Sequence, residues 1–542
     1  MSELLEVRVG PPAHGGHCVA RADGRVIFVR HALPGELVRV SLTDGGDKRR
    51  FWRGDAVEIS EPSADRVPSV WPEAGPGGVG GGELAHVALG AQRTWKTTVL
   101  HDTMRRIGHV DLAEAGLAHV AVEALPGDDE RNGLGTRTRI DLVVGADGRA
   151  GMFGHRSHDV VAITSMPLAV PAIEDLGLFA EPWGGLAPGA RLDVVAPSQG
   201  SPVVLVDGVP VGDGADLRGA PRAAAPSDAV DLSGAGTGRG GVRQTHANRG
   251  EGSRGAAGRG AGRGGSGRGH GPADVRGRGA AGRGGGAADG RGRDGRQAGR
   301  PAGSAHPGDA GRGDAGRGPH GAGALALSGA GAAPARTSIR EVVATPFGAI
   351  TYRVGAGGFW QVHREAPAVL TAAVLDAADP QTGERVLDLY SGSGLFTVPL
   401  AHAVGEAGRV DAVEGDERAV KDARRNLHAH PNAVLHAERV DEASLGAIAG
   451  DGAEVDVVVL DPPRSGAGAA VMGALAALGP RRIVYVACDP AALARDVAAV
   501  AAHGYRLRGL RAFDLFPHTH HFESVAVLER DLTAGRAGHA AG

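Results

Sequence analysis

Apolar residues follow two different spacings along this chain. In the first 60 residues, short strand-like runs such as 5–9, 25–29 and 37–41 are separated by turn residues, among them Gly15–Gly16, and the run 5–9 alternates between apolar and polar residues. Alternation with a period of two is typical of strands that bury one face, and clustered glycines mark the turns between them. This pattern predicts a small OB-like β-barrel over residues 1–62.

The middle of the chain mixes one helix with further short strands. Residues 91–107 have the spacing of a helix, and strand patterns follow between residues 120 and 213. The strand pattern returns over Ile339–Tyr352. We therefore predict a β-rich central domain formed by residues 63–213 plus 336–357.

The sequence between these two parts has a different composition. Residues 214–335 are rich in Gly, Ala and Arg and contain no Phe, Tyr or Trp. Such a segment cannot bury enough apolar surface to offset its conformational entropy, so a disordered insertion is predicted. Its Arg-Gly repeats leave two roles open, a salt-sensitive RNA tether and a passive linker in a tolerant loop.

From residue 358 to 531, strand and helix patterns alternate. This order predicts a Rossmann-like parallel sheet with helices on both faces, which makes the whole chain a multidomain α/β protein. Residues 532–542 are predicted to form a disordered tail.

A glycine turn follows the first predicted strand of this α/β domain. Ser391–Gly394 comes directly after the apolar run that ends at Tyr390. A second strand ends at Glu414, about 20 residues on, where an acid can accept hydrogen bonds from ribose hydroxyls. Thr397 replaces the third glycine of the dinucleotide fingerprint, which favours S-adenosylmethionine over NAD.

Three later strand ends carry reactive side chains. Asp461 precedes two prolines at the end of one apolar run, and Cys488 ends the next. Glu523 begins the last strand, which is predicted to be antiparallel. Open α/β sheets bind ligands at the carboxyl ends of their strands, so these side chains are expected to share one cleft. A thiol that acts there as a nucleophile is expected to be partly exposed, with a lowered pKa.

Composition narrows the class of protein further. The net charge of −4 indicates no general affinity for nucleic acid, so any basic surface must be local. Two cysteines are too few for a disulfide framework, which favours a reducing, cytoplasmic setting. The chain opens without a signal peptide, and no apolar run reaches the roughly 18 residues that span a bilayer, so no membrane partner is expected. The default expectation is a monomer.

Two further clusters, one basic and aromatic and one of histidines, are weaker indications of function. Residues 48–53 combine basic and aromatic side chains, which suits contact with RNA phosphates and bases and equally suits a solvated hairpin edge. His518, His520 and His521 are closely spaced and lack a matching cysteine or acid pair, so no metal site is predicted.

Five motifs in order resemble those of the RNA uracil-5-methyltransferases, which make 5-methyluridine in tRNA and ribosomal RNA. They are Gly358–Val362, Asp388–Gly394, Asp461–Arg464, Ala487–Pro490 and His521–Glu523. The N-terminal barrel is similar to the TRAM domain of many members. The resemblance covers nearly the whole chain outside the Gly/Arg-rich insertion, and it implies a class I methyltransferase fold with S-adenosylmethionine as cofactor and RNA as partner.

The resemblance also implies roles for single residues. Gln361, Tyr390, Glu414 and Asp461 would contact the cofactor. Cys488 would add to C6 of uracil to activate C5, and Glu523 would then remove the C5 proton. The target base would be flipped out of its stack. Several relatives bind an iron–sulfur cluster through four cysteines, but the corresponding stretch near residues 71–78 has none, so no cluster is expected.

Three other functions compete with this interpretation. RNA cytosine-5-methyltransferases use the same thiol addition, but usually place a second cysteine just after the Asp-Pro-Pro turn, where this chain has Arg464–Gly466. A non-catalytic RNA-binding protein on a methyltransferase scaffold would not need both Cys488 and Glu523. An NAD-linked oxidoreductase is disfavoured by the missing third glycine.

Overall fold

The computed structural model describes residues 4–46, 49–155, 157–212, 335–450, 452 and 454–531. The predicted insertion, apart from Ala335, lies outside these residues. So do the predicted tail and Lys48 of the basic and aromatic run.

Six strands at the N-terminus form one sheet, as the alternating pattern predicted. They are β1 (Leu5–Arg8), β2 (Pro12–Ala13), β3 (His17–Ala22), β4 (Arg25–Arg30), β5 (Leu37–Asp44) and β6 (Trp52–Glu61), in the order β1-β5-β6-β4-β3-β2. Alternate side chains such as Val7, Ile27, Val29, Val38 and Val40 point into a shared core. The alternate positions are only partly buried, as at Arg39 and Ser41 of β5, which is the period of two expected of a strand with one buried face.

Helix α1 (Leu89–Arg106) connects two hydrophobic cores. Trp95 and Val99 pack into the core of the N-terminal sheet, whereas Leu100 and Met104 pack into the core of the C-terminal domain. Both faces of this helix are therefore buried along part of its length.

The central region is built on a second antiparallel sheet. Its strands are β8 (Arg139–Val144), β9 (Ala150–Phe153), β10 (Val160–Ala162), β11 (Arg191–Val195), β12 (Val203–Val206) and β13 (Val209–Pro210), in the order β10-β9-β8-β11-β12-β13. The short helix α2 (Pro171–Glu174) lies in the connection between β10 and β11, whereas η1 (Pro72–Ala74) lies between β6 and α1.

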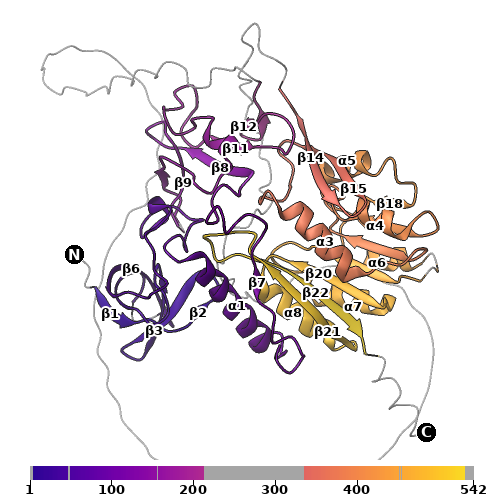
Figure 1. Ribbon diagram of the computed structural model, residues 1–542, viewed down its shortest axis with the longest axis horizontal. Helices are drawn as coiled ribbons and strands as arrows, with labels where there is room; N and C mark the ends of the chain where they lie inside the picture. The colour runs from indigo at the N-terminus through magenta and orange to yellow at the C-terminus, as the bar shows by residue number, and fades with distance from the viewer. Residues whose placement is uncertain are drawn as a thin grey trace, which may run out of the picture. The chain divides into compact units, whose positions relative to one another are not determined.

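The strands that follow the insertion form a sheet of their own. β14 (Ser338–Thr345) and β15 (Gly348–Gly355) pair in an antiparallel hairpin and do not join the six-stranded central sheet. Buried side chains of this hairpin, including Ile339 and Tyr352, belong to a core shared with the C-terminal domain and with Val203 of β12. The hairpin lies beside α5 in Figure 1.

The C-terminal domain is a sheet of eight strands with helices on both faces (Figure 1). Its strands are β16 (Arg385–Leu389), β17 (Arg409–Val413), β18 (Ala433–His436), β19 (Val457–Leu460), β20 (Arg482–Ala487), β21 (Tyr505–Phe513) and β22 (Glu523–Arg530), joined by β7 (Val122–Glu123). Its helices are α3 (Ala366–Ala378), α4 (Thr397–Val404), α5 (Glu417–Asn426), α6 (Glu442–Ala449), α7 (Ala469–Leu478) and α8 (Pro490–Ala501).

The strand order is β18-β17-β16-β19-β20-β22-β21-β7. The first five strands are parallel, and β22 is antiparallel to both of its neighbours, as predicted. The direction of the chain through the sheet reverses between β16 and β19, and α/β sheets bind their ligands at such a switch point.

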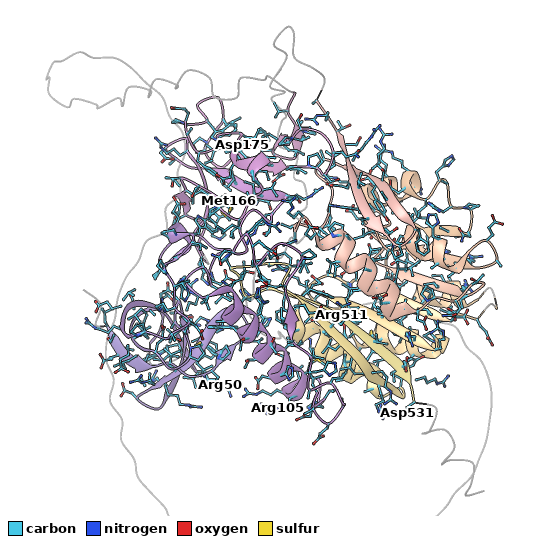
Figure 2. The ribbon with its side chains drawn as sticks, in the orientation of Figure 1. Arg50, Arg105, Met166, Asp175, Arg511 and Asp531 are labelled. Carbon is cyan, nitrogen blue, oxygen red and sulfur yellow. The ribbon has the colours of Figure 1, made fainter. Side chains whose placement is uncertain are left out.

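The C-terminal sheet also takes a strand from the central region. β7 pairs in parallel with the end of β21, and Arg511 of β21 forms an ion pair of 2.8 Å with Glu123 of β7; Arg511 is labelled in Figure 2. Within the described residues, no helix is both long enough and apolar enough to cross a membrane.

Candidate active site

The predicted catalytic residues meet at the carboxyl edge of the C-terminal sheet. Cys488 follows β20 and Glu523 begins β22, and these strands pair so that Ala487 lies opposite Ser524. The next position along this antiparallel pair brings Cys488 beside Glu523. Asp461 follows β19, the parallel neighbour of β20, and therefore reaches the same edge.

Two of the predicted cofactor residues lie on the adjoining strands. Tyr390 follows β16, and Glu414 follows β17, the parallel neighbour of β16. Gln361 is nearly buried in the connection between β15 and α3, outside the sheet edge. Three of the four predicted cofactor residues are thus on one edge of the sheet, with the two predicted catalytic residues.

The turn after β16 has the geometry of a ligand cradle. Gly392 and Gly394 have φ values of 58° and 94°, a region that favours glycine, and Tyr390 also has a positive φ of 59°. A Cβ atom placed on Gly392 would meet nothing within 4 Å, so open space lies next to the turn. The carboxylate of Glu414 accepts hydrogen bonds from the backbone N–H groups of Gly392 (2.8 Å) and Asp416 (2.7 Å), which fixes it beside this space.

Thr397, which takes the place of a third glycine, has a structural role. Its hydroxyl donates a hydrogen bond to Oδ2 of the buried Asp388. Oδ1 of Asp388 and the hydroxyl of Ser391 are buried and have no hydrogen-bond partner among the described residues. Two unpartnered polar atoms at a glycine turn are typical of a site that binds a polar ligand.

Three carboxyl groups at this edge, those of Asp388, Asp461 and Glu523, are hard to ionise. Burial raises the pKa of Asp388 to about 7, and burial together with the nearby Asp388 raises the pKa of Asp461 to about 7. Burial, and then the charge of Asp461, hold the pKa of Glu523 well above its usual range. Acids with strongly raised pKa values gathered in one place are typical of a functional site.

The environment of Cys488 differs from the sequence prediction in one respect. The residue is partly exposed, as expected, but the expected lowering of its pKa is wrong. Burial, followed by the charges of Glu523 and Asp461, raises the pKa of the Cys488 thiol to about 12, and Arg464 offsets only part of this effect. Nearby negative charges and low polarity both disfavour the thiolate form of Cys488.

The loop that precedes Glu523 is held by side chains that the sequence analysis did not identify. Lys96 and Gln92 of α1 are fully buried; Lys96 forms an ion pair with Asp514, and Gln92 accepts a hydrogen bond of 2.7 Å from the N–H of His518. The ring of His518 bonds to Gln92 and to the carbonyl of Asn132. A signal was available in the sequence, because Gln92 and Lys96 interrupt the apolar face of a helix at a spacing of one turn.

Residues near 71–78, which correspond to the iron–sulfur ligands of some relatives, pack against other residues of the chain and surround no open space for a cluster. Trp71 is 1% exposed, and a Cβ atom on Gly82 would lie 2.7 Å from its ring. The chain offers no thiolate there. These residues do not fit an iron–sulfur cluster, which needs four soft ligands around an open space.

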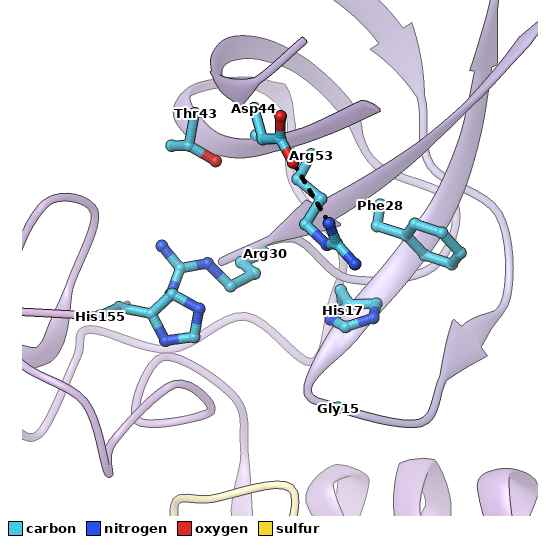
Figure 3. A pocket seen from close by; sticks show the side chains of 9 residues that line it. Gly15, His17, Phe28, Arg30, Thr43, Asp44, Arg53 and His155 are labelled. Carbon is cyan, nitrogen blue, oxygen red and sulfur yellow. Dashed lines mark hydrogen bonds and ion pairs between the residues drawn. The ribbon is translucent and has the colours of Figure 1, made fainter. Parts of the chain in front are cut away.

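The basic and aromatic run borders a cavity in the N-terminal domain. The cavity has a volume of about 250 Å³ and is lined by Gly15, His17, Phe28, Arg30, Thr43, Asp44, Arg53, Gly54 and His155 (Figure 3). Arg53 also lies 4.7 Å from the ring centre of Phe51, which is 36% exposed, while the ring of Trp52 is covered by Arg25. Phe51 is therefore at the surface, and Trp52 is half-buried.

Comparisons with known proteins agree with this architecture. Residues 335–531 match the family model described as tRNA (uracil-5-)-methyltransferase, and residues 3–57 match the TRAM domain. A solved tRNA (uracil-54, C5)-methyltransferase of Pyrococcus abyssi, in complex with S-adenosyl-L-homocysteine, superposes with a TM-score of 0.54 at 20% identity, covering 97% of this chain and 100% of that one. This likeness establishes a class I methyltransferase fold with an N-terminal TRAM domain.

Relatives of similar length establish the family. An uncharacterized RNA methyltransferase of Streptomyces avermitilis is 37% identical, covering 98% of this chain and 99% of its own. The 23S rRNA (uracil(1939)-C(5))-methyltransferase of Methylococcus capsulatus is 31% identical, covering 98% of both. The chain with this glycine turn, sheet edge and N-terminal TRAM domain therefore belongs to the RNA uracil-5-methyltransferases, the S-adenosylmethionine-dependent enzymes that methylate C5 of uridine in RNA.

Proposed function

We propose that this enzyme methylates a uridine of tRNA or ribosomal RNA through a covalent bond between Cys488 and C6 of the base, with Glu523 as the general base. The observation that carries the proposal is the position of these two side chains at the ends of paired strands, one step beyond the Ala487–Ser524 pair. A nucleophile that adds to C6 and a base that acts on C5 must lie side by side, because these two ring atoms are bonded to each other.

We also propose that Gln361, Tyr390, Glu414 and Asp461 hold S-adenosylmethionine. The open space beside Gly392 and the unpartnered polar atoms of Asp388 and Ser391 support this assignment. When bound, the cofactor supplies a sulfonium methyl group. Its positive charge would offset the negative charges of Asp461 and Glu523, which raise the pKa of Cys488. The Glu414 carboxylate, already fixed by two N–H donors, suits ribose hydroxyls.

Cys488 and Glu523 act on two neighbouring atoms of the base, C6 and C5. The Cys488 thiolate adds to C6, so the S–C6 bond forms and the electron pair of the C5–C6 double bond moves toward O4. The resulting enolate makes C5 nucleophilic enough to accept a methyl group. Glu523 then takes the proton from C5, the double bond returns, and the S–C6 bond breaks to release the thiolate.

RNA would be held by the N-terminal and central domains. The cavity of Figure 3 presents Arg30, Arg53 and His17 beside Phe28, a combination that suits a phosphate together with a stacked base. Arg30 forms hydrogen bonds of 2.8 and 2.7 Å with Asp55, so its guanidinium is fixed in the wall of the cavity. Contacts of this kind would hold the RNA in register while the target base turns out of its stack.

Trapping on a fluorinated substrate tests the covalent mechanism. With S-adenosylmethionine and RNA that carries 5-fluorouridine, we expect the wild-type enzyme to form an adduct that survives a denaturing gel, because fluorine at C5 blocks proton removal. Cys488→Ala should form none, and transcripts of tRNA and ribosomal RNA should differ in yield. If the wild-type protein binds cofactor and RNA and forms no adduct on either, the thiol mechanism is wrong.

The charges around Cys488 predict how its thiol reacts with iodoacetamide in the free enzyme. Replacing Asp461 with Asn removes a charge that raises the thiol's pKa, so alkylation of Cys488 should be about tenfold faster, the effect of one pKa unit. Since the pKa of Asp461 is about 7, its carboxylate is present above pH 7, and the difference between the two proteins should disappear below that pH.

Mass spectrometry of the alkylated peptides measures this rate. Cys18 serves as the internal reference, because it is fully buried and its pKa is raised by burial and by Glu36. Equal rates for the two proteins at pH 8.5 would show that Asp461 does not control the thiol.

A further inference from the structure

A turn of the TRAM domain contacts the loop that carries the proposed nucleophile. His14 follows β2, and its Nε2 lies 3.0 Å from Oδ2 of Asp489, the residue directly after Cys488. Asp489 also caps helix α8 by accepting a hydrogen bond of 2.7 Å from the N–H of Ala492. Burial opposes the charge of Asp489, but the contacts with His14 and Ala492 outweigh it and lower its pKa. The carboxylate thus links the TRAM domain to the start of the helix next to Cys488.

The same turn reaches the loop that carries the proposed base. Oε1 of Glu83 accepts a hydrogen bond of 3.1 Å from the N–H of His520 and also contacts Nδ1 of its ring. Gly16 packs onto this pair: a Cβ atom there would lie 2.9 Å from Cγ of Glu83 and 3.1 Å from Nδ1 of His520. The loop continues from His520 to Glu523 within three residues.

The opposite side of the turn borders the cavity of Figure 3. Gly15 and His17 belong to the lining of this cavity, together with Arg30 and Arg53. The turn therefore lies between a basic cavity suited to RNA and the two loops at the sheet edge. Gly15 and His17 of the cavity lining are direct chain neighbours of His14 and Gly16, which lie against Asp489 and His520.

We propose that the turn formed by residues 14–16 is a positioning element that couples RNA held by the TRAM domain to the placement of Cys488 and Glu523. The proposal rests on the catalytic roles given to those two residues above. His14 and Glu83 act through Asp489 and His520, and neither needs to touch the substrate. Displacements of about 1 Å in a reacting group can slow catalysis about 100-fold, so contacts that fix two loops at once have a large influence on rate.

Two matched glycine variants test the proposal. Gly16→Ala introduces a methyl group against Glu83 and His520, whereas Gly24 lies in the same domain with nearly the same φ (75° against 76°) and nothing within 4 Å of an added Cβ. Both substitutions impose the same backbone strain, and only Gly16→Ala disturbs the loops. We expect Gly16→Ala to slow adduct formation with saturating 5-fluorouridine RNA and S-adenosylmethionine by tenfold or more, with the RNA dissociation constant unchanged, and Gly24→Ala to match wild type.

A pair of substitutions at His14 provides the second test. His14→Ala removes the contact with Asp489 and should also slow adduct formation at saturating RNA. His14→Gln keeps a donor for Asp489 and should restore most of the rate. If His14→Ala weakens RNA binding and leaves the rate at saturation unchanged, the turn is an RNA contact only and the proposal is wrong.

Amide hydrogen exchange gives a readout that does not depend on catalysis. In the free enzyme, peptides covering residues 486–493 and 516–524 should exchange faster in Gly16→Ala than in Gly24→Ala or wild type. Equal exchange in all three proteins would overturn the positioning role. If the wild-type enzyme forms no adduct while the exchange differs as expected, the proposed nucleophile is wrong and the link between the turn and the loops stands.

Metal binding is the competing explanation for the Glu83–His520 contact. The ligand atoms of Glu83, His520 and His521 lie within 4.8 Å of one another, a spacing that a divalent cation can bridge. We expect the enzyme to retain its full rate after treatment with a chelator. A rate that falls on chelation and returns with added zinc would make these residues a metal site and overturn their assignment as a direct contact.

Discussion

Replacing Glu523 with Gln should lower turnover by about 10² to 10⁴-fold, the range that a general base contributes, and should leave methylated RNA attached to Cys488. The amide keeps the size of the side chain and resembles the protonated form that burial and Asp461 favour in the free enzyme. Thiol addition and methyl transfer can then proceed, but nothing removes the C5 proton. With methyl-labelled S-adenosylmethionine and ordinary RNA, the label should migrate with the protein on a denaturing gel.

Glu123→Gln is the matched control for this experiment. Glu123 is a partly exposed glutamate on β7 of the same sheet, and its carboxylate forms an ion pair with Arg511. An exposed ion pair contributes little to stability, so this variant should turn over like the wild type. If Glu523→Gln loses turnover and no labelled adduct accumulates, Glu523 acts before methyl transfer, and another group removes the C5 proton.

Local features made the sheet edge predictable from the sequence. The turn after β16, the acid after β17 and the thiol after β20 each follow an apolar run directly, and the parallel order of the strands brings such ends together. The helix α5 was also predictable, since Asp416 caps its N-terminus by accepting hydrogen bonds from Arg418 and Ala419.

Features that depend on contacts between distant segments were not predictable in this way. Glu83 meets His520 across 437 residues, and β7 joins a sheet whose other strands begin at residue 385. The prediction of a lowered pKa for Cys488 was wrong for the same reason. The strand pattern predicted the position of the thiol, but the direction of its pKa shift depends on its burial and on the acids that approach it from other strands.

Lys96 should be among the most important residues for stability, because it forms a fully buried ion pair with Asp514. The two side chains are 0% and 1% exposed, and Nζ of Lys96 also donates a hydrogen bond of 3.1 Å to the carbonyl of Phe516. Lys96→Met should lower the free energy of unfolding by about 3–5 kcal/mol, since it leaves the carboxylate of Asp514 buried without its partner. Urea unfolding followed by circular dichroism measures the loss.

The double variant Lys96→Met/Asp514→Leu distinguishes the contribution of the ion pair to stability from that of packing. Replacing both partners removes the unpaired charge, so most of the lost stability should return. A deficit that persists in the double variant would mean that Lys96 stabilises the loop before Glu523 by packing and not by charge.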